Sequence, residues 1–186
     1  MKLPTNPRQL IIAILILAGL SLIPGLKLRD ARQIEEQVLG ALTQTAPPPG
    51  YYPVTQVIDG DTIKVTLEGR EETVRLLSID TPETKAPGQA VECYGPEASQ
   101  HLTDLLTNQS VRLEVDSLQG DRDRYGRLLR YLYLPDGTFV NALMVQQGFA
   151  RIYSKTGSDQ LEYIRTLESA ARASHLGLWG QCTYAN

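Results

Sequence analysis

Three carboxylates and one guanidinium group stand close together in the sequence. Asp61, Asp80 and Glu83 supply the carboxylates, and Arg75 lies between the first and the second. Such ligands suit Ca2+, which takes about six to eight carboxylate, carbonyl and water oxygens in a tolerant geometry. Zinc is disfavoured, because no His or Cys lies near these carboxylates. If the three carboxylates converge, they predict a cation site that handles an anion, and our hypothesis is that the anion is a phosphodiester.

A second arginine extends this pattern. Arg127 ends the segment Asp121-Arg122-Asp123-Arg124-Tyr125-Gly126-Arg127. Two guanidinium groups can hold a phosphate by paired hydrogen bonds and can stabilise the additional charge of its transition state. An alternative stays open, because alternating Asp and Arg near a turn are also typical of a solvated surface with weak ion pairs, above all for Arg122 and Arg124. Taken singly, the other residues also fit a turn-capping Asp, an exposed Glu and a rim Arg.

The elements that would position these residues begin after residue 50, where the pattern takes a period of two. Alternating residues over 54–58, 63–67 and 74–79 predict three strands, joined by turns at Asp59-Gly60 and Glu68-Gly69. Asp61 then begins one strand and Asp80 ends another, so the two meet only if those strands are neighbours. Pro82 favours an extended Thr81, which can turn a backbone carbonyl toward the ion.

The rest of the domain alternates helices and strands. Pro96 suits a helix start, and apolar spacing predicts two further helices over 139–147 and 161–176, stopped by Gly148 and Gly177. Residues 111–115 and 128–134 read as strands. Five short strands with a helix after the third predict a mainly β, α+β fold: a closed five-stranded Greek-key barrel of the oligonucleotide-binding type (OB-fold) with three α-helices.

The first fifty residues differ from the rest. Residues 10–26 form an uncharged apolar run preceded by Lys2 and Arg8. The run is long for a signal-peptide core and short for a spanning helix, so residues 1–26 are either a signal peptide or a signal-anchor transmembrane segment, a hydrophobic helix in both cases. Both alternatives predict an extracytoplasmic protein, secreted or anchored to the membrane. Residues 27–50 predict a short amphipathic helix and a Pro-rich linker, which places the main domain at 51–186.

Composition and charge limit the function classes. The chain has 186 residues, of which 42% are hydrophobic and 21% charged, as in an ordinary globular protein with one domain and appendages. From Tyr51 onward there are 13 Lys and Arg against 18 Asp and Glu, a net charge of −5. This balance weighs against tight, non-specific adhesion to nucleic acid, which depends on a basic surface.

A set of linked motifs resembles the thermonuclease, or staphylococcal nuclease-like, family in order and in spacing, from about Gln56 to Trp179. The motifs are Val57-Ile58-Asp59-Gly60-Asp61-Thr62, Val74-Arg75-Leu76-Leu77, Asp80-Thr81-Pro82-Glu83-Thr84-Lys85, Tyr94-Gly95-Pro96-Glu97-Ala98, Asp123-Arg124-Tyr125-Gly126-Arg127, and Val140-Asn141 with Gln147-Gly148. The resemblance implies a barrel with three helices and a monomeric, Ca2+-dependent endonuclease and exonuclease, which cleaves DNA and RNA with little sequence preference and leaves 3′-phosphates.

The resemblance also implies residue roles. The implied metal ligands are Asp61, Asp80 and the carbonyl of Thr81, and the implied catalytic residues are Arg75, Glu83 and Arg127. The implied pocket tyrosines are Tyr125 and Tyr153, and we add Arg124 as a further candidate substrate-binding residue. One departure concerns the active-site loop, which carries Ala86, Gly88 and Gln89 where the family's best-known member is richer in basic residues. This departure, like the acidic domain, bears on substrate affinity and not on the reaction.

We further predict a disulfide between Cys93 and Cys182, the two cysteines of the chain. In the family fold the last helix packs back near the barrel, so this bond would clamp the C-terminus beside the active-site loop. An even cysteine count in an exported chain favours the pairing. A pair of free thiols stays open as the alternative.

A second class of function also stays open, namely a non-catalytic OB-fold module that binds nucleic acid or protein through stacking aromatics. Tyr51, Tyr52, Tyr131 and Tyr133 suit such a role, although aromatic residues on barrel strands more often serve packing. The carboxylate set discriminates between the two classes, because a binding module has no use for three acidic groups beside a phosphate. We therefore favour the enzyme. His101 is expected on a helix surface without a role.

Overall fold

The computed structural model describes residues 47–84 and 91–183. The predicted hydrophobic segment 1–26 and most of the predicted segment 27–50 lie outside the described residues, as do Ala86, Gly88 and Gln89. Within the two described ranges, no helix is long and apolar enough to cross a membrane.

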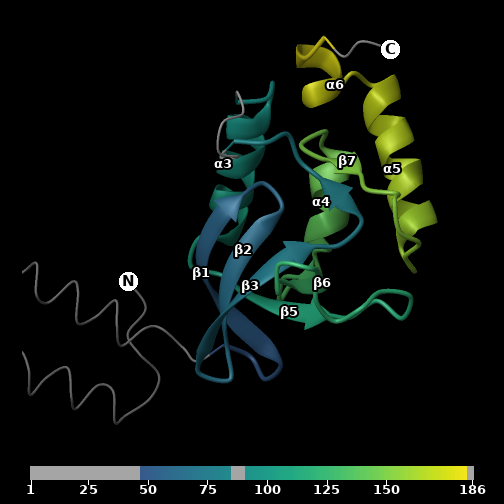
Figure 1. The fold of residues 1–186 in the computed structure, drawn as a ribbon. Helices are drawn as coiled ribbons and strands as arrows, with labels where there is room; N and C mark the ends of the chain where they lie inside the picture. The colour runs from purple at the N-terminus through teal and green to yellow at the C-terminus, as the bar shows by residue number, and fades with distance from the viewer. Residues whose placement is uncertain (1–46, 85–90, 184–186) are drawn as a thin grey trace, which may run out of the picture. The chain divides into compact units, whose positions relative to one another are not determined.

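Five strands close into a barrel in the order β1-β2-β3-β6-β5 (Figure 1). Their bounds are Tyr51–Asp59 for β1, Thr62–Leu67 for β2, Arg70–Leu76 for β3, Ser110–Glu114 for β5 and Leu128–Tyr133 for β6. Neighbouring strands run antiparallel, except that β3 and β6 are parallel. The predicted five-stranded barrel is confirmed.

The alternation along the strands fills the barrel with apolar side chains. Because successive side chains of a strand point to opposite faces, one face of β2 and β3 lines the interior and the other remains available for polar residues. The following barrel residues are at most 1% exposed: Ile63, Val65, Val74, Leu76, Val111 and Leu132. This parity decides the direction of Arg75, which stands between two core residues and therefore points out of the barrel.

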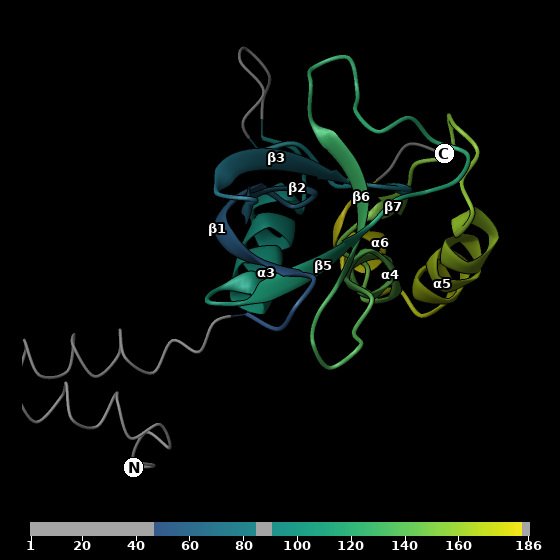
Figure 2. The ribbon, with the colours of Figure 1, turned by 90° about the horizontal axis from the view of Figure 1, so that it is seen from below.

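The three predicted helices are present as α3 (Gly95–Leu106), α4 (Val140–Gln146) and α5 (Leu161–Ala173). Helix α3 begins with Pro96 in its first turn and packs against β1, whereas α4 and α5 lie side by side away from α3 (Figure 2). Helix α5 ends earlier than predicted, and a short helix α6 (Leu178–Gln181) that the sequence did not predict follows it. His101 lies on α3, as predicted, but it is half-buried rather than on the open surface, because its ring stacks on Phe149 at a centroid distance of 4.0 Å.

The predicted third strand over 74–79 is divided in two. Strand β3 ends at Leu76, and Ser78 adopts a positive φ of 64°. Residues Ile79–Asp80 then form β4, which pairs outside the barrel with β7, Arg151–Ile152. The strand after Asp61 and the first part of the predicted strand, β2 and β3, are barrel neighbours. The prediction that Asp80 ends that barrel strand was wrong, because the chain turns out of the barrel before it reaches Asp80.

A buried amide fixes this turn to the barrel. Asn141 of α4 donates from Nδ2 to the carbonyl of Leu77 at 2.9 Å and accepts from the backbone N–H of Leu132 at 3.0 Å. Since its side chain is fully buried, both hydrogen bonds satisfy backbone groups that water does not reach. The turn that carries the chain from Arg75 to Asp80 thus has a defined conformation.

The predicted disulfide joins Cys93, just before α3, to Cys182, just after α6, with a Cα–Cα distance of 5.9 Å. The two cysteines are 89 residues apart in the sequence. In the unfolded chain the bond therefore closes a long loop, and in the folded chain it holds the C-terminal segment beside the start of α3.

Reducing this disulfide should destabilise the domain. Closing a loop of this length stabilises a fold by at most about 4 to 5 kcal/mol in the chain-entropy model. We expect the thermal midpoint to fall by about 10 °C when a dithiol reductant is added, as measured by circular dichroism. The double variant Cys93→Ser with Cys182→Ser is the control and should not respond to the reductant. An unchanged midpoint for the reduced wild-type protein would contradict the prediction.

Candidate active site

Asp61 connects the barrel to the segment that follows β4. It is the last residue of the turn between β1 and β2 and is only 7% exposed. Its Oδ2 accepts from the backbone N–H of Thr81 at 3.0 Å and from the hydroxyl of Thr81 at 3.2 Å, while its Oδ1 accepts from the hydroxyl of Thr62 at 3.0 Å. Gly60 permits this approach, because a Cβ there would stand 2.8 Å from the Thr81 side chain.

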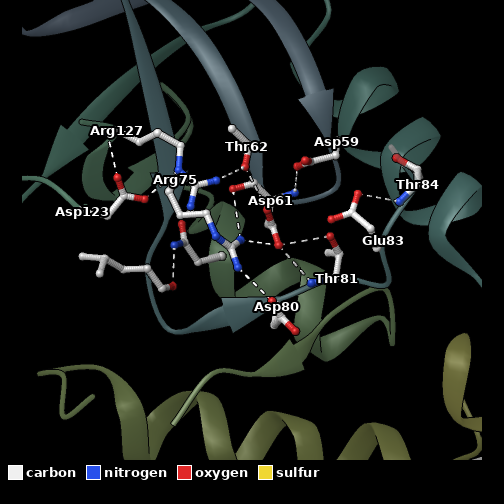
Figure 3. A network of polar contacts seen from close by, with 12 residues as sticks. Asp59, Asp61, Thr62, Arg75, Asp80, Thr81, Glu83, Thr84, Asp123 and Arg127 are labelled. Carbon is white, nitrogen blue, oxygen red and sulfur yellow. Dashed lines mark hydrogen bonds and ion pairs between the residues drawn. The ribbon is translucent and has the colours of Figure 1, made fainter. Parts of the chain in front are cut away.

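Arg75 lies between two of the predicted carboxylates (Figure 3). Its Nη1 forms an ion pair with Oδ2 of Asp61, and its Nη2 lies 2.9 Å from Oδ1 of Asp80. The Arg75 and Asp61 side chains are only 15% and 9% exposed, whereas that of Asp80 is 51% exposed. The guanidinium group therefore supplies the counter-charge that allows two carboxylates to face one small space.

Arg127 is held by its own turn. Asp123 accepts the backbone N–H groups of Tyr125 and Arg127 at Oδ1, at 2.9 and 3.0 Å, and its Oδ2 lies 2.7 Å from Nε of Arg127. Although burial opposes it, hydrogen bonding from Arg127 lowers the pKa of Asp123. Nη1 of Arg127 reaches toward the hydroxyl of Thr62, at 3.5 Å. The bonds at Nε and Nη1 orient the guanidinium group toward the same region as Arg75, as Figure 3 shows.

Glu83 faces the same cavity from the opposite end of the network in Figure 3. Its Oε1 accepts from the backbone N–H of Thr84 at 2.9 Å. The cavity has a volume of about 270 Å3, and its lining residues are Asp59, Asp61, Arg75, Asp80, Thr81, Pro82, Glu83, Tyr125 and Arg127. All six residues predicted for metal binding and catalysis therefore line one cavity.

The carboxylates do not, however, converge on one point. Among residues 47–84 and 91–183, no three Asp, Glu, His or Cys side chains lie together in a metal-binding arrangement. The guanidinium group of Arg75 stands between Asp61 and Asp80, and Glu83 bonds to the neighbouring Thr84 backbone. The cavity holds the predicted groups, but not as a preformed three-carboxylate cage.

The donor chemistry of this cavity nevertheless fits a hard cation. Burial and the adjacent Asp61 raise the pKa of Asp59 to about 6. Desolvation at the cavity wall also raises the pKa of Asp80, although Arg75 opposes this effect. These acids are thus held close together at an electrostatic cost that a bound cation would remove. The carboxylates of Asp61 and Asp80 and the backbone oxygen of Thr81 are the hard ligands that Ca2+ prefers.

A larger cavity of about 560 Å3 adjoins the first and shares Arg75, Tyr125 and Arg127 with it. All three predicted substrate-binding residues, Tyr125, Tyr153 and Arg124, line it. Tyr125 is 69% exposed, and the Arg124 guanidinium stacks over its ring at 4.7 Å. Arg122 instead pairs with Glu72 at 2.8 Å, so for this residue the surface alternative holds.

Sequence reasoning did not assign a role to two acids of this site. Asp59 lines the smaller cavity, and its elevated pKa depends on burial that the sequence does not display. Asp123 accepts hydrogen bonds from the backbone N–H and from Nε of Arg127. The sequence did contain a signal for this contact, because an Asp four residues before an Arg, across a Gly-containing turn, can accept both kinds of N–H group.

Comparison with known proteins identifies the family of this chain. Residues 73–181 match the family model described as staphylococcal nuclease homologue. The match covers more than half of the chain and includes Arg75, Asp80, Glu83 and Arg127. The chain belongs to the staphylococcal nuclease homologue family.

Individual relatives agree with this assignment. The chain is 40% identical over 129 residues to a thermonuclease of Staphylococcus intermedius, an alignment that covers 69% of this chain and 75% of the relative. It is 39% identical over 132 residues to endonuclease YncB of Bacillus subtilis (strain 168), covering 69% of this chain and 61% of the relative. A prophage-derived endonuclease of the same organism, YokF, is also 39% identical, and there the alignment spans only 44% of the relative's length.

The elevated pKa of Asp59 predicts that the substitution Asp59→Asn increases the stability of the folded protein, by an amount that depends on pH. The unfolded pKa of Asp lies near 4. The folded wild-type protein therefore loses stability as the pH rises from about 4 to 6, because the unfolded chain ionises Asp59 first. The asparagine removes that charge and keeps an acceptor for the backbone N–H of Asp61, which now bonds to Oδ1 of Asp59 at 3.1 Å.

The metal-free variant should thus be more stable than the wild-type protein at pH 7, by up to about 3 kcal/mol, and equally stable near pH 4. Urea unfolding at both pH values with a chelator present measures the difference. A gain of the same size at pH 4 and pH 7 would show that the carboxylate charge is not its source.

Proposed function

We propose that this protein is a Ca2+-dependent phosphodiesterase that hydrolyses DNA and RNA with little sequence preference. The observation that carries the proposal is the position of two guanidinium groups, Arg75 and Arg127, on one cavity with Asp61, Asp80 and Glu83. Membership of a nuclease family, and relatives named endonuclease and thermonuclease, support the nuclease activity. The proposal includes endonuclease and exonuclease action that leaves 3′-phosphates.

Arg75 and Arg127 would bind the scissile phosphate. Each guanidinium group offers N–H donors in a planar fork that matches two phosphate oxygens. As a five-coordinate transition state gains charge on these oxygens, the same donors bind it more strongly than they bind the ground state. Arg127, fixed by Asp123 through its Nε, would lie toward the leaving 5′ oxygen.

Glu83 would act on the attacking water. Its side chain lines the cavity opposite the arginines. Because our proposal does not assign this carboxylate to the cation, it can accept a hydrogen bond from a water and orient the lone pair of the water oxygen toward phosphorus. Asp61, Asp80 and the carbonyl of Thr81 would hold the cation. When bound, Ca2+ would supply positive charge beside the phosphate and lower the barrier to attack.

The larger cavity supports the proposed low sequence preference. Its aromatic residues, Tyr125 and Tyr153, offer rings on which any base can stack, since every base has a π-face. Arg124 and Lys155 supply local positive charge there in a domain that is acidic as a whole. We infer that both DNA and RNA strands bind weakly and that the protein acts as a monomer.

We also propose an extracytoplasmic location, secreted or tethered by the N-terminal segment. The apolar run over 10–26 and the Cys93–Cys182 disulfide support this location, because oxidising compartments preserve such bonds.

Substitution of the three catalytic residues tests the proposed function. Glu83→Gln, Arg75→Lys and Arg127→Lys should each lower kcat by about 100-fold or more with the fold intact, because each removes an interaction made in the transition state. Steady-state hydrolysis of single-stranded DNA with Ca2+ gives kcat, and circular dichroism checks the fold.

Arg122→Lys is the matched control, since Arg122 pairs with Glu72 outside the cavity and should leave kcat unchanged. A triple variant that carries Glu83→Gln, Arg75→Lys and Arg127→Lys together gives the decisive comparison. If it keeps wild-type activity, the cavity is not catalytic, and a nucleic-acid-binding or protein-binding module becomes the better description.

A further inference from the structure

The backbone of Glu83 is held by one residue that the proposed mechanism does not use. The backbone N–H of Glu92 donates to the carbonyl of Glu83 at 2.9 Å, and the backbone N–H of Glu83 donates to Oε2 of Glu92 at 3.2 Å. Both hydrogen-bonding groups of the Glu83 main chain therefore bind Glu92. This reciprocal pair, the Glu83–Glu92 clamp, fixes the point from which the Glu83 side chain reaches into the cavity.

Glu92 is itself anchored from two directions. Its neighbour Cys93 is joined to Cys182, beyond the last helix. Its Oε2 also lies 3.7 Å from Nη2 of Arg151, and Arg151 stands opposite Asp80 in the β4–β7 pair. The clamp is thus attached both to the C-terminal segment and to the short sheet that carries Asp80.

The start of α3 packs directly against the backbone of Pro82 and Glu83. A Cβ on Gly95 would lie 2.9 Å from the backbone oxygens of both Pro82 and Glu83. The backbone N–H of Gly95 donates to the carbonyl of Glu92 at 3.1 Å. The backbone around Glu83 therefore rests directly on the chain between Glu92 and Gly95, and a shift of this chain would move Glu83 as well.

We propose that Glu92 is a positioning residue for Glu83, through the hydrogen bond that its carboxylate accepts from the Glu83 backbone. The proposal rests on the proposed role of Glu83 in hydrolysis. An effect of the Glu92 charge is the competing explanation, but the ion pair with Arg151 joins side chains that are 50% and 34% exposed, and such pairs contribute little. A neutral acceptor at this position should therefore preserve the clamp.

Two substitutions separate the acceptor from the charge. Glu92→Gln keeps a carbonyl oxygen that can accept from the Glu83 N–H, whereas Glu92→Leu removes the acceptor at similar size. Misplacement of a catalytic group by less than about 1 Å can reduce turnover many-fold. We expect Glu92→Leu to lower kcat about 10-fold with KM changed less than about twofold, and Glu92→Gln to keep kcat within about threefold of wild type.

Glu97→Leu and Glu97→Gln are matched controls, because Glu97 is an exposed acid in the first turn of α3 and is not part of the clamp. Neither should change kcat. Equal losses in Glu92→Leu and Glu92→Gln would assign the effect to charge and overturn the proposal, as would wild-type kcat in Glu92→Leu.

A double-mutant cycle shows whether Glu92 acts through Glu83. In a Glu83→Gln background, Glu92→Leu should cost less than about twofold in kcat, because the group that it positions is already disabled. A further loss of about 10-fold in that background would mean that Glu92 acts elsewhere, and would overturn the proposal.

Amide hydrogen exchange at Glu83, followed by NMR, provides a readout that does not depend on activity. Exchange should be at least about 10-fold faster in Glu92→Leu than in wild type, and near wild type in Glu92→Gln. Unchanged exchange in Glu92→Leu would overturn the clamp. If the wild-type protein hydrolyses no phosphodiester, the proposed function fails, yet this exchange measurement still decides whether the clamp exists.

Discussion

The ion pairs that Arg75 makes with Asp61 and Asp80 are the interaction on which the candidate site depends. Asp61 belongs to the barrel and Asp80 to the short sheet outside it, so the guanidinium group joins two parts of the fold as well as two charges. Without the Arg75 guanidinium group between them, the carboxylates of Asp61 and Asp80 would repel each other at the wall of one small cavity, with their hydration reduced. The direction of Arg75 follows from strand parity, because its neighbours Val74 and Leu76 fill the core.

The remainder of the domain keeps the partners of Arg75 in place. Asn141 fixes the turn after β3, and the β4–β7 pair fixes Asp80 at the end of that turn. The segment after Asp80 returns to Asp61 through Thr81 and then rests on the start of α3, which the disulfide connects to the C-terminal segment. The candidate cavity, formed largely by loops, thus obtains its geometry from a rigid barrel and a few buried polar contacts.

Much of this arrangement could be predicted from the sequence. The period of two predicted the barrel strands β2 and β3, and the spacing of the motifs brought Asp61, Asp80, Glu83 and Arg127 into one hypothesis. The β4–β7 pair escaped prediction because two-residue strands have no periodicity to detect. The burial that raises the pKa of Asp59 depends on the folded chain, and the contact between Glu83 and Glu92 joins two residues nine positions apart that belong to no common helix or strand. Convergence of three carboxylates was expected from residue types and spacing, and Arg75 occupies the space between two of them instead.

The proposed function requires that this cavity hydrolyses a phosphodiester with a bound Ca2+ and expels the 5′ oxygen. Cleavage of a defined oligonucleotide in 18O-labelled water, analysed by mass spectrometry, is a direct test. We expect that Ca2+ supports cleavage, that one 18O atom enters a 3′-phosphate for each bond broken, and that a chelator abolishes the reaction. Label in a 5′-phosphate, or equal cleavage with the chelator present, would contradict the proposed function.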